Sequence, residues 1–274
     1  MNQIIKKIYP VSKKPICSAD SLYLKPVLSR IKSPKGPIYY ANFLTSLDGR
    51  IATYSRKHAS LLTPKSIKSD IDFSLFCQLH AQADCLVTNT KYIQGLEKGY
   101  YGNILSIKDP NLNKWRQKNN IKEQKIIILS NSLNFKKNKY LEIYKERITI
   151  LTTSKNQKKI NSFNENGYRI IKCSGKNISP NCLNKYIIKN KYKSIYFIAG
   201  PIIVEQMISN NLLNRLYCST SISMIGTKNY DTIIRGNFLS KPTKLELKEM
   251  YIYNNESKKI KEQTLFQIFN LKGK

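Results

Sequence analysis

The sequence predicts an α/β fold, because short apolar runs typical of buried strands alternate with segments of helical periodicity along most of the chain. The last two apolar runs, residues 244–254 and 264–272, alternate apolar and polar positions as an antiparallel pair does. Neither an internal repeat nor a linker between two cores is visible, so we expect one domain over residues 37–274. Its sheet is expected to be mostly parallel, with an antiparallel hairpin at the C-terminal end.

The first 36 residues are expected to form a loosely attached arm, because they are rich in proline and lysine and show little periodicity. The chain starts with charged residues and has no apolar stretch like that of a secretion signal. No run approaches the ~20 apolar residues that span a bilayer, and the six cysteines contain no C-x-x-C pair. Reduced thiols in a cytoplasmic protein are the simplest interpretation.

The first half of the domain combines two expected strands with a long helix. A strand that begins at Pro37 runs into a turn at Asp48-Gly49. Residues 64–82 have apolar side chains at helical spacing, and Pro64 supplies a start signal together with Ser66. The other elements expected here are a buried strand at 83–89, a short helix or turn at 91–99, and a polar surface excursion at 103–123.

The second half continues the alternation. A basic amphipathic helix at 183–192 precedes a strand at 194–199, and a further strand lies within 213–226. Three more strands are expected earlier in this half, at 125–131, 147–153 and 168–174.

Gly200 and Pro201 stand between the strand 194–199 and a segment of helical period, and this junction is the most informative local feature. Glycine permits a tight turn and close backbone approach, and proline suits the first helical position. The unpaired amides and positive dipole end of the new helix suit a phosphate group. Taken alone, the segment is also typical of an ordinary strand-to-helix turn.

The formal net charge of +30 comes from 39 lysines and 8 arginines that are spread over the whole length. Proteins that read nucleic acid more often concentrate arginine and aromatic residues on one surface, so we expect no specific nucleic-acid partner. The positive field favours anionic small molecules such as a dinucleotide or a sugar phosphate. Because the chain has only two histidines, a histidine-rich metal site is not available, and we expect no metal.

Three ordered segments, 42–52, 81–89 and 196–226, resemble the reductase domain of riboflavin biosynthesis, a member of the dihydrofolate-reductase-like superfamily. The resemblance runs from about Pro37 to near the C-terminus and implies a three-layer α/β/α fold. It also implies a divergent stand-alone copy, because the H-x-E and P-C-x-x-C motifs of a zinc deaminase half do not occur in the sequence.

The same resemblance implies an enzyme that uses NADPH to reduce a ribosylamino-pyrimidine 5′-phosphate to its ribityl form. The protein would mainly orient the reactants, since the cofactor carries the difficult chemistry. Family habit and the terminal hairpin suggest a homodimer. The residues that match cofactor contacts of the family are Leu44, Ser60, Thr88, Asn89, Thr90, Gly200, Pro201, Ile202, Ile203 and Val204.

The substrate side of the resemblance is weaker. Asp48 and His58 are the best candidates for catalysis, and His58 also matches a substrate contact. A family arginine that binds substrate appears here as His80, a weaker phosphate anchor because it is only partly charged at ordinary pH. Ile198 stands where the family has an acidic residue, and segment 91–105 lacks the family's aspartate, proline and arginine.

Two alternatives to the active pyrimidine reductase stay open, the first because of this asymmetry and the second because of the basic charge of the chain. One is a catalytically inactive copy of the fold that binds a nucleotide and serves a regulatory or partner-binding role. The other is a basic RNA-associated protein, whose RNA binding would survive moderate salt.

Overall fold

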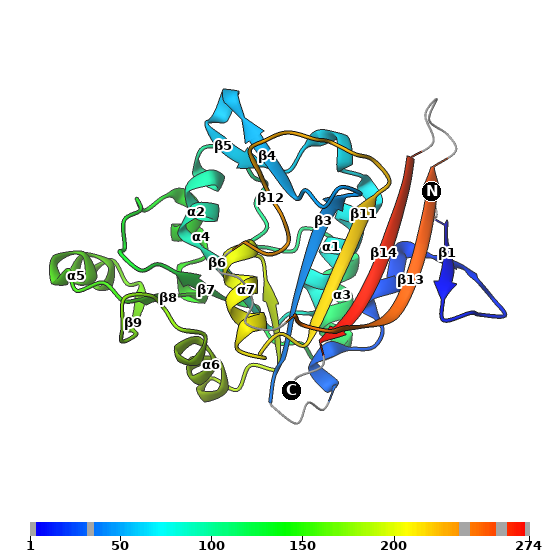
Figure 1. The fold of residues 1–274 in the computed structure, drawn as a ribbon. Coiled ribbons are helices and arrows are strands. Elements are labelled where there is room, and N and C mark those ends of the chain that lie inside the picture. The colour runs from blue at the N-terminus through cyan, green and yellow to red at the C-terminus, as the bar shows by residue number, and fades with distance from the viewer. Residues whose placement is uncertain (1–3, 32–35, 236–241, 256–261, 272–274) are drawn as a thin grey trace. The chain divides into compact units, whose positions relative to one another are not determined.

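The computed structural model describes residues 4–31, 36–235, 242–255 and 262–271 (Figure 1). The chain divides into two compact units, which are described separately. Unit 1 comprises Met1–Pro26, Tyr39–Leu79 and Gly200–Lys274, and unit 2 comprises Val27–Ile38 and His80–Ala199. The single domain expected over residues 37–274 stays a prediction.

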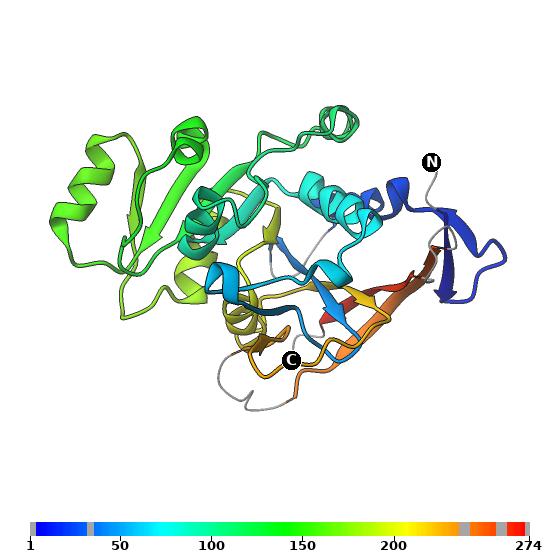
Figure 2. The same ribbon diagram turned by 90° about the horizontal axis from the view of Figure 1, so that it is seen from above.

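Among its described residues, the larger sheet of unit 1 has six strands in the order β2-β1-β13-β14-β11-β3. Only β3 and β11 run parallel to each other, and the remaining neighbours are antiparallel. The predicted C-terminal hairpin is confirmed, and β13 and β14 lie side by side in both views (Figures 1 and 2). The strands are β1 (Ile4–Tyr9), β2 (Ile16–Ser18), β3 (Ile38–Ser46), β11 (Arg215–Ser221), β13 (Leu245–Asn255) and β14 (Glu262–Leu271).

The N-terminal arm differs from the loose attachment expected of it. Strand β1 pairs with β13, and Ile5 and Ala19 are buried. The Tyr23 backbone amide donates to Gln78 Oε1 at 2.8 Å, and Gln78 Nε2 donates to the Ala19 carbonyl at 2.7 Å. Residues up to Pro26 are therefore integrated into unit 1 through pairing with strands and helices distant in sequence, which local periodicity does not reveal.

Helix α1 (Asp70–Gln82) begins later than the predicted start at Pro64, because residues 65–67 form a separate 3-10 turn. Ile71, Leu75 and Leu79 are buried at helical spacing. The Tyr40 hydroxyl of β3 donates to the Leu79 carbonyl at 2.8 Å. Unit 1 also holds α7 (Pro201–Ser209) and a small sheet in the order β12-β4-β5, formed by β4 (Ala52–Ser55), β5 (Ser60–Leu62) and β12 (Tyr230–Asp231).

The described part of unit 2 contains five parallel strands in the order β10-β6-β7-β8-β9. The strand β10 follows the other four in sequence yet pairs with β6, so the strand order reverses at that point. All five predicted runs are confirmed as strands, and most of their residues are buried, as both faces of a parallel sheet require. They are β6 (Cys85–Asn89), β7 (Lys125–Leu129), β8 (Ile148–Thr152), β9 (Arg169–Lys172) and β10 (Ser194–Phe197).

Helices connect these strands, and one of them replaces the predicted polar excursion at 103–123. Asp109 caps α3 (Pro110–Lys118) and Pro110 occupies its first turn. Arg116 of this helix is buried and donates to the Ala81 and Ala83 carbonyls at 2.7 and 2.6 Å. The short polar helix was missed because a buried arginine supplies its anchor. The other helices of unit 2 are α2 (Thr90–Glu97), α4 (Lys139–Ile143), α5 (Gln157–Glu165) and α6 (Pro180–Lys189).

Two cysteines correct the expectation of reduced thiols. Cys173 and Cys182 form a disulfide with a Cα–Cα distance of 6.1 Å, while Cys17, Cys77, Cys85 and Cys218 are free. The bond joins the residue after β9 to the first turn of α6. The nine-residue separation carries no recognisable motif, because the proximity is created by the tertiary fold. Among the described residues, the helices are all too short or too polar to cross a membrane.

Candidate active site

The junction at Gly200 has the backbone geometry that the sequence predicts. Gly200 occupies the N-cap position of α7, where no side chain makes a capping bond, with φ 83° and ψ 177°, a combination that essentially only glycine adopts. A Cβ atom at this position would meet no atom within 4 Å, so the space beside the backbone is open. Pro201 occupies the first turn of α7, as predicted. A ligand can therefore approach the main chain closely at this corner.

The N-terminus of α7 keeps amides available for an anion. No side chain caps this end, and its first turn contains no acidic residue. Ile202 is 52% exposed and Val204 is buried, so the start of the helix is anchored on one side and open on the other. An uncapped helix start with an uncompensated dipole suits a phosphate group. The partly exposed segment 200–203 is the best-formed part of the candidate site.

Leu44 lies near the end of β3 in a well-defined register. It pairs with Ser219 of the parallel strand β11, and register partners in adjacent strands project their side chains from the same face of a sheet. Leu44 is only partly exposed, and Ser219 is 5% exposed.

Asp48 organises the turn that follows β3. Its carboxylate accepts hydrogen bonds from the Ser46 hydroxyl, the Arg50 guanidinium and the amides of Ile225 and Gly226, the last two at 3.2 and 2.9 Å. These bonds, led by that from Ser46, lower the pKa of Asp48 to about 2. At neutral pH the carboxyl has no proton to donate. The structure gives Asp48 a turn-forming role, and a catalytic role stays a prediction.

His58 and Ser60 lie close together in the chain, on either side of a short reversal. His58 ends a three-residue 3-10 turn with Arg56 and Lys57, and Ser60 begins β5. Ala59 between them has φ 45°. Both predicted residues are partly exposed. The turn presents three basic side chains in succession, which suits an anionic substrate group.

The predicted cofactor contacts of unit 2 stand at the carboxyl end of β6. Thr88 is fully buried, and its Oγ1 has no hydrogen-bond partner among the described residues. Asn89 caps α2 through a 3.1 Å bond from the Tyr92 amide and donates to the Ala199 carbonyl at 2.5 Å. Thr90 begins α2 and is partly exposed. Asn89 is thus tied to the residue that precedes Gly200 in the chain.

His80 has an environment that does not fit its predicted substrate contact. It is 3% exposed, and its Nε2 lies 2.5 Å from the Ile104 carbonyl oxygen. Burial lowers the pKa of His80 to about 4, with a smaller contribution from the positive charges of Arg116 and Arg147. A buried neutral imidazole cannot anchor a phosphate at neutral pH. His80 is a structural histidine, and the family's arginine has no substitute at this position.

Asp72 is a candidate functional residue that the sequence did not reveal. It lies in the first turn of α1, with one oxygen bonded by the Ser219 hydroxyl and Oδ1 buried without a hydrogen-bond partner among the described residues. Burial raises the pKa of Asp72 to about 6. The residue as a whole keeps some exposed surface, so the burial concerns the carboxyl end. Periodicity marks Asp72 only as a polar position next to the apolar stripe of α1.

The surroundings of Asp72 connect it to Leu44. Ser219, which holds the Asp72 carboxylate, is the register partner of Leu44, so α1 covers the face of the sheet from which the Leu44 side chain projects. Phe73 and Phe76 follow on α1 with ring centroids 6.0 Å apart and an interplanar angle of 13°. Phe73 is 60% exposed.

Comparison with known proteins identifies the family. The model of the RibD C-terminal domain matches residues 37–258. The chain belongs to the RibD C-terminal domain family. This membership agrees with the family resemblance predicted from three short segments, and the match covers most of the predicted reductase domain. No curated protein matches the chain.

Solved structures support the fold. A pyrimidine reductase-like protein from Corynebacterium diphtheriae aligns with TM-score 0.70 at 17% identity, covering 94% of this chain and 100% of that one. The riboflavin biosynthesis reductase of Saccharomyces cerevisiae aligns with TM-score 0.55 at 14% identity, covering 92% and 99%. The RibD protein of Acinetobacter baumannii aligns with TM-score 0.59 at 14% identity, covering 88% of this chain and 59% of that one. The chain thus spans about three fifths of that RibD protein. The predicted α/β fold of the reductase family is confirmed by these alignments.

Replacing Asp48 by Asn is expected to lower the melting temperature at pH 7, because the variant loses the carboxylate that holds the Ile225 and Gly226 amides. The folded pKa of about 2 lies below the ordinary value, so the contribution of Asp48 is complete above pH ~4 and is lost as pH falls toward 2. Thermal melts from pH 2 to 7 should therefore show a gap between wild type and variant that closes in acid. A gap that stays constant across this range would contradict the role given to Asp48.

Replacing Asp72 by Asn is expected to stabilise the fold above pH 6. The raised pKa means that ionisation of Asp72 opposes folding, so its penalty is absent below pH ~4, grows as pH rises toward about 6 and is complete above that value. A gain on the order of 2 kcal/mol in the free energy of unfolding is expected at pH 8. Denaturant titrations at pH 4 and pH 8 measure it, with Asp70→Asn on the exposed side of α1 as the matched control.

Proposed function

We propose that the protein is an NADPH-dependent reductase that converts a phosphoribosylamino-pyrimidine to its ribityl form in riboflavin biosynthesis. Membership in the RibD C-terminal domain family and the reductase neighbours support an oxidoreductase of that pathway in general. The observation that carries the finer proposal is the open Gly200 corner at the start of α7. It offers main-chain amides to a phosphate without an intervening side chain.

The residues of the Gly200 corner fit a dinucleotide phosphate. Gly200 leaves space where any other residue would place a Cβ atom, and α7 begins without a cap or a first-turn carboxylate. The proposal assigns phosphate contacts to residues 200–204 and a contact with the nicotinamide half to the Leu44 backbone. Ser60 is assigned a further cofactor contact, and so are Thr88, Asn89 and Thr90. When bound, NADPH supplies the hydride for the reduction.

Asp72 is proposed as the group that holds the proton for the reduced substrate. Its Oδ1 is buried without a hydrogen-bond partner among the described residues, and a carboxyl with a pKa of about 6 keeps its proton in about a tenth of the molecules at pH 7. The Ser219 hydroxyl bonds its other oxygen and thereby fixes the orientation of the carboxyl. Asp48, which is ionised and fully engaged, is better suited to holding the turn after β3.

The basic turn Arg56–His58 is proposed to bind the substrate phosphate. Arg56 and Lys57 are exposed, and His58 is partly exposed. This arrangement would compensate for the missing family arginine, whose position is taken by the buried His80. We also propose that the protein is a cytoplasmic homodimer, because the family resemblance implies this state.

A catalytically inactive nucleotide-binding copy is the second candidate function. The observation that favours it is the loss of polar substrate contacts, with Ile198 at the acidic position and His80 buried and neutral. Such a copy would bind NADPH and oxidise none of it across a panel of pyrimidine precursors. An active reductase would consume NADPH in proportion to the ribityl product formed.

Replacing Gly200 by Val is expected to weaken NADPH binding at least about tenfold, because the side chain enters the open space and φ 83° is strained for a β-branched residue. Fluorescence titration of NADPH measures the change. Gly167→Val is the matched control, since Gly167 also has a positive φ of 78° and a Cβ there meets only the flexible Lys145 side chain. Unchanged affinity in a folded Gly200 variant would contradict the proposed phosphate position.

Replacing Asp72 by Asn is expected to lower kcat by about a hundredfold, the usual contribution of a general acid, while the dissociation constant of NADPH stays within about twofold. The wild-type rate is expected to fall as pH rises through about 6, because the protonated form of Asp72 is the active one. The variant should lose this pH dependence, and Asp70→Asn should keep it. A variant with the wild-type rate and pH profile would exclude Asp72 as the acid.

A further inference from the structure

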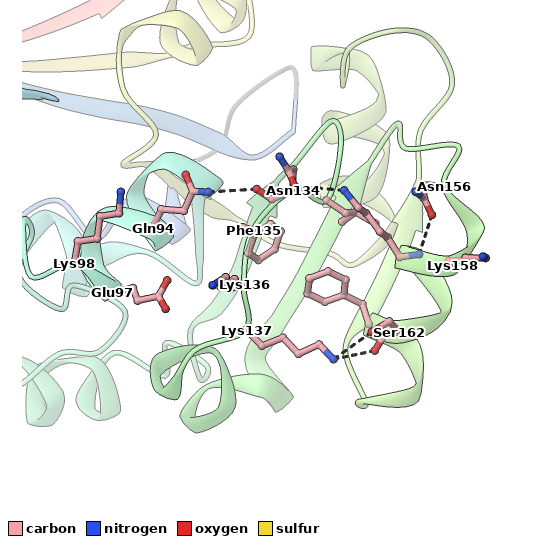
Figure 3. Close-up of a pocket in the computed structure, with 13 residues that line it drawn as sticks. Gln94, Glu97, Lys98, Asn134, Phe135, Lys136, Lys137, Asn156, Lys158 and Ser162 are labelled. Atoms are coloured by element: carbon pink, nitrogen blue, oxygen red, sulfur yellow. Dashed lines mark hydrogen bonds between the residues drawn. The ribbon is translucent and has the colours of Figure 1, made fainter. Parts of the chain in front are cut away.

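A groove in unit 2 contains none of the residues assigned to the reductase (Figure 3). Its volume is about 1040 Å³. The C-terminal half of α2 forms one wall and the first two turns of α5 form the other, with residues 133–137 running between them. The groove therefore requires an explanation of its own.

Internal hydrogen bonds hold the groove in shape. Gln94 Nε2 of α2 donates to the Asn134 backbone carbonyl at 3.2 Å, and the Lys159 ammonium of α5 donates to Asn134 Oδ1 at 3.4 Å. Lys137 Nζ donates to the Ser162 carbonyl at 3.1 Å. Asn134 thus connects both walls. A preformed cavity of this kind loses less entropy when a ligand binds than a flexible surface does.

The middle of the groove is aromatic. Phe135 is partly exposed, and its ring lies 5.1 Å from that of the buried Phe163 at an interplanar angle of 37°. The Lys137 ammonium lies 5.6 Å from the centroid of the Phe163 ring. The backing by Phe163 keeps the Phe135 ring in place, so it can serve as a stacking surface for a flat ligand.

Lysine is more frequent in the lining of the groove than in the chain as a whole. Five of the 13 lining residues are lysines, against 39 lysines in 274 residues overall. One acidic residue, Glu97, opposes them, and the lining contains no arginine. Lys136 and Lys158 are exposed and make no hydrogen bond or ion pair within the described part of the chain. Their ammonium groups are available to a ligand.

The N-terminus of α5 adds to this positive potential. Asn156 caps the helix neutrally by accepting from the Lys159 amide at 3.1 Å, and the first turn contains no acidic residue. The positive end of the helix dipole is therefore not compensated from within the helix. The lysines and the N-terminus of α5 at one wall therefore favour binding of a ligand group with concentrated negative charge.

We propose that this groove binds a nucleoside phosphate. Lys136, Lys158 and the start of α5 would contact the phosphate groups, and the base would stack on Phe135. Lysine acts as a point charge that suits phosphate, whereas carboxylates of an acidic peptide are better matched by the bidentate guanidinium that the groove lacks. A half-exposed aromatic ring beside lysines is also the combination that recognises nucleotides without reading their sequence.

Uridine diphosphate is the probe for a free nucleotide, because it contains neither the adenine nor the nicotinamide of the proposed cofactor. Isothermal titration with wild type and with Lys136→Gln/Lys158→Gln is expected to show at least a tenfold loss of affinity in the variant. The control, Lys114→Gln/Lys118→Gln on the exposed face of α3, removes the same charge and should change the affinity less than twofold. Equal losses of affinity in the two variants would overturn the proposal. So would the absence of uridine diphosphate binding to wild type at about 1 mM.

Phe135→Leu separates stacking from charge. This variant is expected to bind uridine diphosphate several-fold more weakly and inorganic pyrophosphate with unchanged affinity. Equal losses of affinity for the two probes would contradict stacking of the base on Phe135. A labelled uridine oligonucleotide distinguishes the source of the ligand. Tighter, groove-dependent binding of the oligonucleotide supports the proposal with single-stranded RNA as the source, and tighter binding of the diphosphate supports it with a free nucleotide. Thermal melts test whether the variants fold.

Discussion

The parallel pairing of β3 with β11 is the interaction on which the candidate active site depends. It runs in unbroken register from Tyr40 with Arg215 to Ser46 with Ser221, and it sets Ser219 beside Leu44. Ser219 in turn orients the Asp72 carboxyl of α1. At the end of β3, the Asp48 carboxylate ties the turn to the Ile225 and Gly226 amides that follow β11. A shift of one residue in this register would turn Ser219 away from α1 and leave a buried carboxyl without its hydroxyl partner.

Much of the fold could be predicted because its strands are continuous apolar runs, and the Gly200-Pro201 turn could be predicted because glycine and proline have specific backbone preferences. The integration of the N-terminal arm and the position of α3 depend on partners distant in sequence, such as Gln78 for the arm and the carbonyls that Arg116 reaches. The Cys173–Cys182 bond is equally a product of the tertiary structure. Local patterns carry no information about these contacts.

The candidate site divides in the same way. Main-chain features at Gly200 follow from residue type, so the sequence identified them. The chemistry of individual side chains follows from burial, which the sequence does not display. His80 and Asp72 both lie in α1, yet burial makes the imidazole neutral and leaves the carboxyl able to hold a proton near neutral pH. Reading either residue as an ordinary exposed group would assign it the wrong protonation state.

The disulfide has a consequence for local opening of unit 2. Its short ring closes around Gly175 and Asn177, and the Asn177 side chain bonds Asn131, the second residue after β7. A ring this small restricts few conformations of the unfolded chain as a whole, so its influence is concentrated on the loop that it encloses. Oxidised protein would expose the amides of this loop to exchange only when larger parts of unit 2 open, whereas in a reducing compartment the loop could fray on its own. The solvent protection of one edge of the sheet would then report the redox history of the molecule.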